Sequence, residues 1–146
     1  GTDSATAVRD VSDLVATAGD GESVLIYPEG TRFTQKKHDD LAIRRPNLKN
    51  QLTRWPGLLP PRLGGVSAML EKNPQKDLVF LAHVGFEGSA SIHDLLGGGW
   101  LKQRVILQFW RIPYSEIPTG DPTEFLFSEW DRMQRTVDAL KADLAV

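Results

Sequence analysis

The sequence contains no cysteine and only three histidines among its 146 residues. The absence of cysteine excludes a disulfide framework, a thiolate nucleophile and a cysteine-based zinc site, and three scattered histidines do not favour a histidine-only metal centre. We therefore expect the chain to hold no metal.

Long apolar runs and a strong excess of positive charge are also missing. No stretch approaches the roughly 20 apolar residues that a helix needs to cross a bilayer, and no basic start followed by an apolar segment marks a signal peptide. The formal net charge of -2 argues against a general attraction to nucleic acid. We expect no nucleic-acid partner, and any anion site must be local.

What is present is the composition of a folded domain. Hydrophobic residues make up 40% of the chain and charged residues 25%, which excludes a disordered chain. No internal repeat or linker divides the sequence, so residues 1–146 are expected to form a single domain. The chain starts with Gly1 rather than Met and enters helical periodicity at once, so we expect it to be an excerpt of a longer protein.

Helical and strand patterns alternate along the chain and predict an α/β fold, with a largely parallel or mixed sheet flanked by helices. A buried parallel strand is expected at 23–27 and further strands at 77–86 and 104–112, with a turn at the glycines 97–99. Helices are expected at 2–18, from Thr34 to about Arg45, at 66–70, and from Asp121 through Leu144.

Two features of these elements carry competing interpretations. The last helix has an apolar stripe that predicts packing in the core, with a membrane-surface helix as the alternative. His83 lies within an apolar strand and is predicted to be a hydrogen-bonded core histidine rather than a catalytic one.

The most informative segment follows the first predicted strand, where Glu29, Gly30, Thr31 and Arg32 form a glycine turn. Ligands favour the carboxyl ends of strands in open α/β sheets, and a glycine lets successive backbone N–H groups approach an anion. The planar guanidinium of Arg32 matches two phosphate oxygens, while Glu29 would orient Arg32 or a neighbouring N–H, or accept a hydrogen bond from a substrate hydroxyl. The turn therefore favours a phosphate monoester site, against the alternative of a plain tight turn with an exposed arginine.

Positive charge gathers after this turn. Residues 32–54 contain seven basic and two acidic residues, a net charge of +5, so the rest of the chain carries -7. Three interpretations of this segment stay open. It surrounds the phosphates of a substrate or coenzyme A, it forms a surface that contacts anionic lipid headgroups, or it is a solvated helix and loop.

Residues 27–34, YPEGTRFT, resemble the Phe-Pro-Glu-Gly-Thr-Arg block of the glycerolipid acyltransferases, such as the 1-acylglycerol-3-phosphate O-acyltransferases. Residues 36–38, 58–65 and 111–118 resemble one branch of the same family. The resemblance implies acyl transfer from a thioester of coenzyme A or acyl carrier protein to a hydroxyl of lysophosphatidic acid or a similar lysophospholipid. The thioester would be a co-substrate, and no bound cofactor is expected. The resemblance also implies that the intact protein is associated with the cytoplasmic face of a membrane and acts in phospholipid biosynthesis.

The same resemblance assigns site residues. The acceptor's phosphate would be bound by Glu29, Gly30, Thr31 and Arg32. Further phosphate contacts would come from Lys36, Lys37 and Arg62, although Arg62 is equally well explained as a turn residue.

One departure from the family pattern concerns catalysis. The family's general base belongs to a His-x-x-x-x-Asp block, but Ile43, Gly88 and Gly98 stand five residues after His38, His83 and His93. In the family this block lies upstream of the Glu-Gly-Thr-Arg turn, and only 28 residues precede Glu29 here. The resemblance therefore implies that the chain is the C-terminal part of an acyltransferase catalytic domain, without a catalytic residue and inactive by itself. The alternative is a non-catalytic module that binds a lipid phosphate or another anion.

Overall fold

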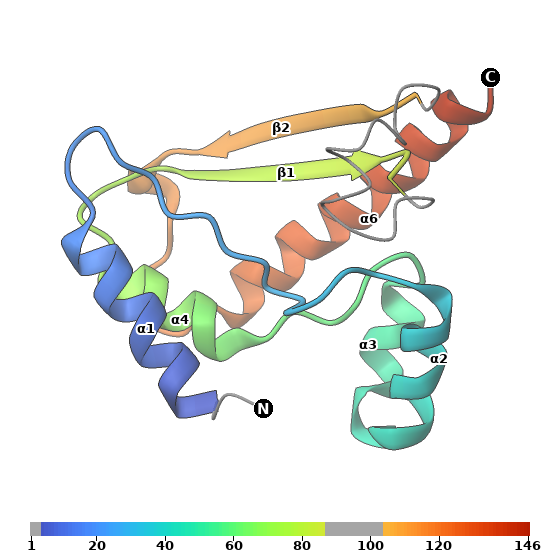
Figure 1. Ribbon diagram of the computed structural model, residues 1–146, viewed down its shortest axis with the longest axis horizontal. Coiled ribbons are helices and arrows are strands. Elements are labelled where there is room, and N and C mark those ends of the chain that lie inside the picture. The colour runs from blue at the N-terminus through green and yellow to red at the C-terminus, as the bar shows by residue number, and fades with distance from the viewer. Residues whose placement is uncertain (1–3, 87–103) are drawn as a thin grey trace, which may run out of the picture.

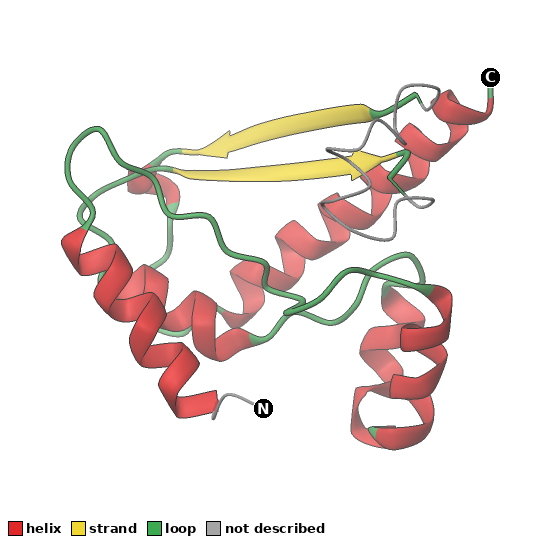
Figure 2. Ribbon diagram, in the orientation of Figure 1, coloured by secondary structure: helices red, strands yellow, loops and turns green. Residues whose placement is uncertain are grey.

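The computed structural model describes residues 4–86 and 104–146, which form several helices and a small two-stranded sheet (Figures 1 and 2). In chain order the elements are α1 (Ser4–Thr17), α2 (Gln35–Arg44), the 3-10 turn η1 (Pro46–Leu48), α3 (Lys49–Arg54), α4 (Leu63–Glu71), β1 (Leu78–Val84), β2 (Ile106–Ile112), the 3-10 turn η2 (Tyr114–Glu116) and α6 (Thr123–Ala145). The predicted turn at residues 97–99 lies outside the described residues.

The sheet consists of β1 and β2, which pair antiparallel with Leu81 opposite Phe109. The combination of helices and a sheet agrees with the coarse α/β prediction. The expected parallel or mixed sheet is wrong for the described residues, because β2 returns directly alongside β1 in the opposite direction.

The predicted strand at residues 23–27 is also not formed. The segment is extended and alternates in burial, with Ile26 packed against the core and Leu25 and Tyr27 both 73% exposed. Lys76 Nζ donates to the carbonyl oxygens of Gly19 and Glu22, which ties down the start of the segment. A strand needs a ladder with a neighbour, and this segment has the strand pattern without a paired edge.

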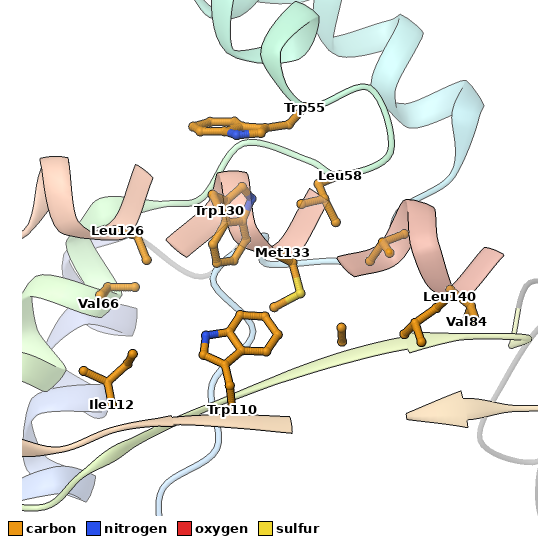
Figure 3. Packing of buried hydrophobic residues seen from close by; sticks show 12 residues of the cluster. Trp55, Leu58, Val66, Val84, Trp110, Ile112, Leu126, Trp130, Met133 and Leu140 are labelled. Carbon is orange, nitrogen blue, oxygen red and sulfur yellow. The ribbon is translucent and has the colours of Figure 1, made fainter. Parts of the chain in front are cut away.

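The core lies between α6 and the inner face of the sheet, and it includes the predicted apolar stripe of α6. Figure 3 shows Trp130 and Met133 of α6 between Trp55 and Leu58 on one side and Trp110 of β2 on the other. The buried stripe residues are Leu126, Trp130, Met133, Val137 and Leu140. The prediction of core packing for this helix is therefore confirmed.

The predicted helices that begin near Thr34 and Asp121 are confirmed, and a hydrogen bond lies at the start of each. Asp121 Oδ1 accepts from the backbone N–H of Thr123 at 3.0 Å where α6 begins, and Thr34 Oγ1 accepts from the N–H of Lys37 at 3.2 Å where α2 begins. Helix α1 packs on α4, and a Cβ at Gly64 would lie only 3.2 Å from Val8 Cγ2. Glycine at this position lets the two helices approach closely.

The outer face of the sheet is exposed and apolar. Leu107 is 50% and Phe109 60% exposed, and His83 of β1 is exposed on the same face. The prediction of a core histidine is wrong, because the alternation of β1 turns Ala82 and Val84 inward and places His83 outside.

Helices α2 and α3 lie side by side and project away from the sheet (Figure 1). Arg54, at the end of α3, donates to both carboxylate oxygens of Asp131 on α6, at 2.8 and 2.6 Å. Trp55 Nε1 donates to the same carboxylate at 2.9 Å, so Asp131 links the C-terminal end of α3 to α6. Among the helices in the described part of the chain, none has the length and hydropathy to cross a membrane.

Candidate functional site

The residues singled out by sequence lie in a tight turn after the extended segment, which we call the anion turn (residues 29–32). The N–H of Gly30 donates to the carbonyl of Tyr27 at 2.8 Å, and Gly30 has a φ of +71°. This backbone conformation favours glycine, so the sequence places the residue where the turn requires it. Thr31 and Arg32 follow it and are exposed.

Arg62 is brought to the anion turn from about 30 residues further along the chain. Its backbone N–H donates to the carbonyl of Pro28 at 2.7 Å. Its guanidinium lies against Gly30, because a Cβ built there would be only 2.8 Å from Arg62 Cζ. The sequence left two roles open for Arg62, a phosphate contact and a plain turn residue. Its position beside Gly30 is compatible with a phosphate contact, which stays a prediction.

The loop that carries Arg62 is fixed by its own buried residues. Leu58 and Leu59 are buried, and so are the two prolines that follow them. The carbonyl of Leu59 accepts from Trp130 Nε1 at 3.1 Å, which joins this loop to α6. The position of the Arg62 guanidinium therefore depends on the packing of the core.

Glu29 holds the same loop from the other side. Its carboxylate accepts from the N–H of Leu59 at 3.3 Å. Burial raises the pKa of Glu29 from 4.5 to about 7, against the opposing effect of the Leu59 hydrogen bond. Glu29 thus orients a neighbouring N–H, which is one of the roles that the sequence left open for it.

Lys37 reaches back to the anion turn from the first turn of α2. Its Nζ donates to Thr31 Oγ1 at 2.7 Å and to the carbonyl of Arg32 at 3.1 Å. Lys36, the neighbouring residue, is exposed and makes no hydrogen bond or ion pair with another described residue. Of the three additional cations expected at the site, the structure brings Lys37 and Arg62 to the turn.

A further cation near this region was missed from the sequence. Lys141 of α6 lies with Nζ 5.9 Å from the centre of the Phe33 ring. Phe33 immediately follows the anion turn. Lys141 lies 108 positions further along the chain, so no local sequence pattern predicts the contact between them.

The described histidines do not supply a base at the turn. His38 Nε2 lies 3.2 Å from the carbonyl of Leu52, so the ring joins α2 to α3. His83 lies on the outer face of β1, with its ring 5.3 Å from that of Phe86. What the described residues assemble is a group of basic side chains around a glycine turn, which has the chemistry of an anion-binding site.

Comparisons with protein-family models, with characterised proteins and with solved structures gave no match to this chain.

Proposed function

We propose that the anion turn binds the phosphate of a lysophospholipid acceptor, in a protein that transfers an acyl group to the acceptor's free hydroxyl. The observation that carries the proposal is the meeting of Arg62 with Gly30, next to Lys37 and Arg32. A turn with a glycine at its centre and basic side chains on separate elements suits a phosphate monoester, since each side chain approaches from its own direction.

In this proposal the residues have distinct roles. Arg32 and Arg62 contact phosphate oxygens, and Lys37 contributes charge while it holds Thr31 and the carbonyl of Arg32 in place. Glu29 faces the loop of Leu59 and acts as a positioning residue for Arg62. The donor would be an acyl thioester of coenzyme A or acyl carrier protein, which is a substrate and not a bound cofactor.

The proton-transfer step needs a residue that this chain does not supply. The acceptor hydroxyl attacks the thioester carbonyl, its proton passes to a general base, and the thiol leaves with a proton returned by that base. The sequence contains no His-x-x-x-x-Asp block. We therefore assign the base to another part of the intact protein and acceptor binding to this chain.

A second candidate function is a non-catalytic module that binds a lipid phosphate. The same sequence observation favours it, because the turn and its basic partners are present while the base is not. The two candidates share the anion turn and differ only in whether the intact protein transfers an acyl group.

Binding of glycerol 3-phosphate and lysophosphatidic acid to the chain, measured by titration calorimetry, tests the shared site. Arg32→Ala and Arg62→Ala should each weaken binding about tenfold or more, because a charged hydrogen bond is worth roughly 1.5–3 kcal/mol. Arg9→Ala, on the exposed side of α1, is the control and should leave the affinity unchanged. Unchanged affinity in both turn variants would overturn the proposal.

Acyl transfer from acyl-coenzyme A to lysophosphatidic acid by the intact protein distinguishes the two candidates. The acyltransferase proposal expects turnover, with a raised KM for the acceptor in Arg32→Ala. Tight acceptor binding without turnover, with either thioester donor, would assign the binding module instead.

A further inference from the structure

The far end of the α2–α3 pair has a composition that the anion turn does not explain. We call residues 43–49 the hairpin tip; they run from the last turn of α2 through η1 to the first residue of α3. The tip projects away from the sheet (Figure 1). Arg44, Arg45 and Lys49 are exposed there, and Ile43 is 78% exposed.

The charge of the tip contrasts with the rest of the chain. Residues 41–54 contain four basic and no acidic residues, whereas the whole chain has 17 basic and 19 acidic, which leaves 13 basic and 19 acidic residues elsewhere. Arg44, Arg45 and Lys49 form no ion pair with any described residue. These cations are therefore available to an external anion.

The nearest acids in the sequence are Asp39 and Asp40, one turn earlier on α2. Asp39 Oδ1 accepts from Gln35 Nε2 at 2.9 Å and lies 3.6 Å from His38 Nδ1, so it is engaged with its own helix. The positive potential of the tip is consequently concentrated beyond these acids.

The exposed isoleucine decides which kind of anion fits the tip. An apolar side chain among cations matches the boundary between lipid headgroups and acyl chains, where the cations meet phosphates and the apolar group leaves water. Residues 41–54 contain no aromatic side chain on which a nucleic-acid base would stack, and the net charge of -2 opposes a long polyanion. The chemistry of the tip favours a lipid surface over a nucleic acid.

We propose that the hairpin tip docks the chain on an anionic lipid surface, with Ile43 at the headgroup boundary and Arg44, Arg45 and Lys49 on lipid phosphates. Helix α2 has 10 residues, so about 15 Å separates the tip from the anion turn at the other end of the helix. The two are separate sites, and the docking proposal does not depend on the proposed function.

Co-sedimentation of the chain with vesicles tests the docking. Vesicles of phosphatidylcholine with a minority of phosphatidylglycerol should bind the chain, and vesicles of phosphatidylcholine alone should bind it much more weakly. Each basic residue near an anionic surface is worth about a fivefold gain in partitioning. Replacing Arg44, Arg45 and Lys49 by glutamine should therefore weaken binding about a hundredfold, and raised salt should weaken the binding of the unmodified chain.

A matched control variant removes the same charge elsewhere. It replaces three exposed basic residues of α1, the end of α4 and α6 by glutamine: Arg9, Lys72 and Arg135. This variant should bind vesicles as the unmodified chain does. Ile43→Ser should weaken binding at all salt concentrations, whereas Leu25→Ser, at a residue 73% exposed on another segment, should not.

Several results would overturn the docking proposal. One is an equal loss of vesicle binding in the tip variant and in the control variant. Another is vesicle binding that depends neither on salt nor on phosphatidylglycerol. The third is an RNA oligonucleotide that binds through the tip while vesicles do not bind. The tip variant keeps the anion turn intact and should bind glycerol 3-phosphate in calorimetry as the unmodified chain does. A failure of the anion turn in phosphate binding is thereby distinguished from a failure of the tip.

Discussion

Glu29 connects pH to the stability of the candidate site. Its carboxylate is largely buried beside the N–H of Leu59, and burial raises its pKa from 4.5 to about 7. Between these two pH values the folded chain binds more protons than the unfolded chain. Stability should therefore fall as pH rises through this window, because the folded state disfavours the charged carboxylate.

The size of the effect follows from the two pKa values. Each tenfold change in proton affinity corresponds to about 1.4 kcal/mol. A pKa of about 7 in place of 4.5 thus costs up to about 3 kcal/mol of unfolding free energy above pH 7, and nothing below pH 4.5. Glu29→Gln removes the charge while keeping an oxygen that accepts from Leu59 N–H, so this variant should lose that pH dependence.

Urea unfolding of the chain and of Glu29→Gln between pH 4 and 8 measures this difference. Tryptophan fluorescence is a suitable probe because Trp55, Trp110 and Trp130 are buried. The two chains should be about equally stable at pH 4, and the variant should be more stable at pH 8. Glu116→Gln, at an exposed acid, is the control, and stability curves of Glu29→Gln parallel to those of the unmodified chain would refute the reasoning.

Two further predictions concern backbone strain and the exposed face of the sheet. Gly30→Ala should lower the unfolding free energy by roughly 1–3 kcal/mol because φ is +71°, and it should weaken phosphate binding because the new Cβ would displace Arg62. Gly120→Ala is the control, since Gly120 also has a positive φ but no atom close to the new Cβ. Equal effects of the two changes on phosphate binding in calorimetry would contradict the role of Arg62. Phe109→Ala should change the unfolding free energy by less than about 1 kcal/mol, while Ile112→Ala should cost roughly 2–4 kcal/mol in urea unfolding, since only Ile112 is buried. The reverse order of these two losses would show that β2 turns its other face to the core.

The elements that the sequence predicted correctly are those whose signal is local. The stripe of α6 specifies a buried helix by its spacing alone, and Thr34 and Asp121 mark helix starts by bonds to residues two or three positions away. The turn at Gly30 is local in the same sense, because a single glycine supplies the backbone conformation. Such features need no information about distant parts of the chain.

The features that the sequence did not predict all depend on partners far along the chain. Leu25 and Tyr27 have strand propensity, but a strand also needs a hydrogen-bonded neighbour, and the sheet in the described residues consists of β1 and β2. His83 looked like a core residue because its neighbours are apolar, yet which face of β1 is buried is decided by the docking of α6.

The candidate site also combines local and long-range features, which explains why the sequence left two roles open for Arg62. Its proximity to Gly30 requires Leu59 to be anchored by Trp130 and by Glu29, three contacts between segments 30 to 71 positions apart. A motif of four residues therefore identifies the turn, whereas the second arginine of the site is specified by the core. It follows that a variant such as Trp130→Phe, which removes the bond to the Leu59 carbonyl, should weaken phosphate binding without touching the turn itself.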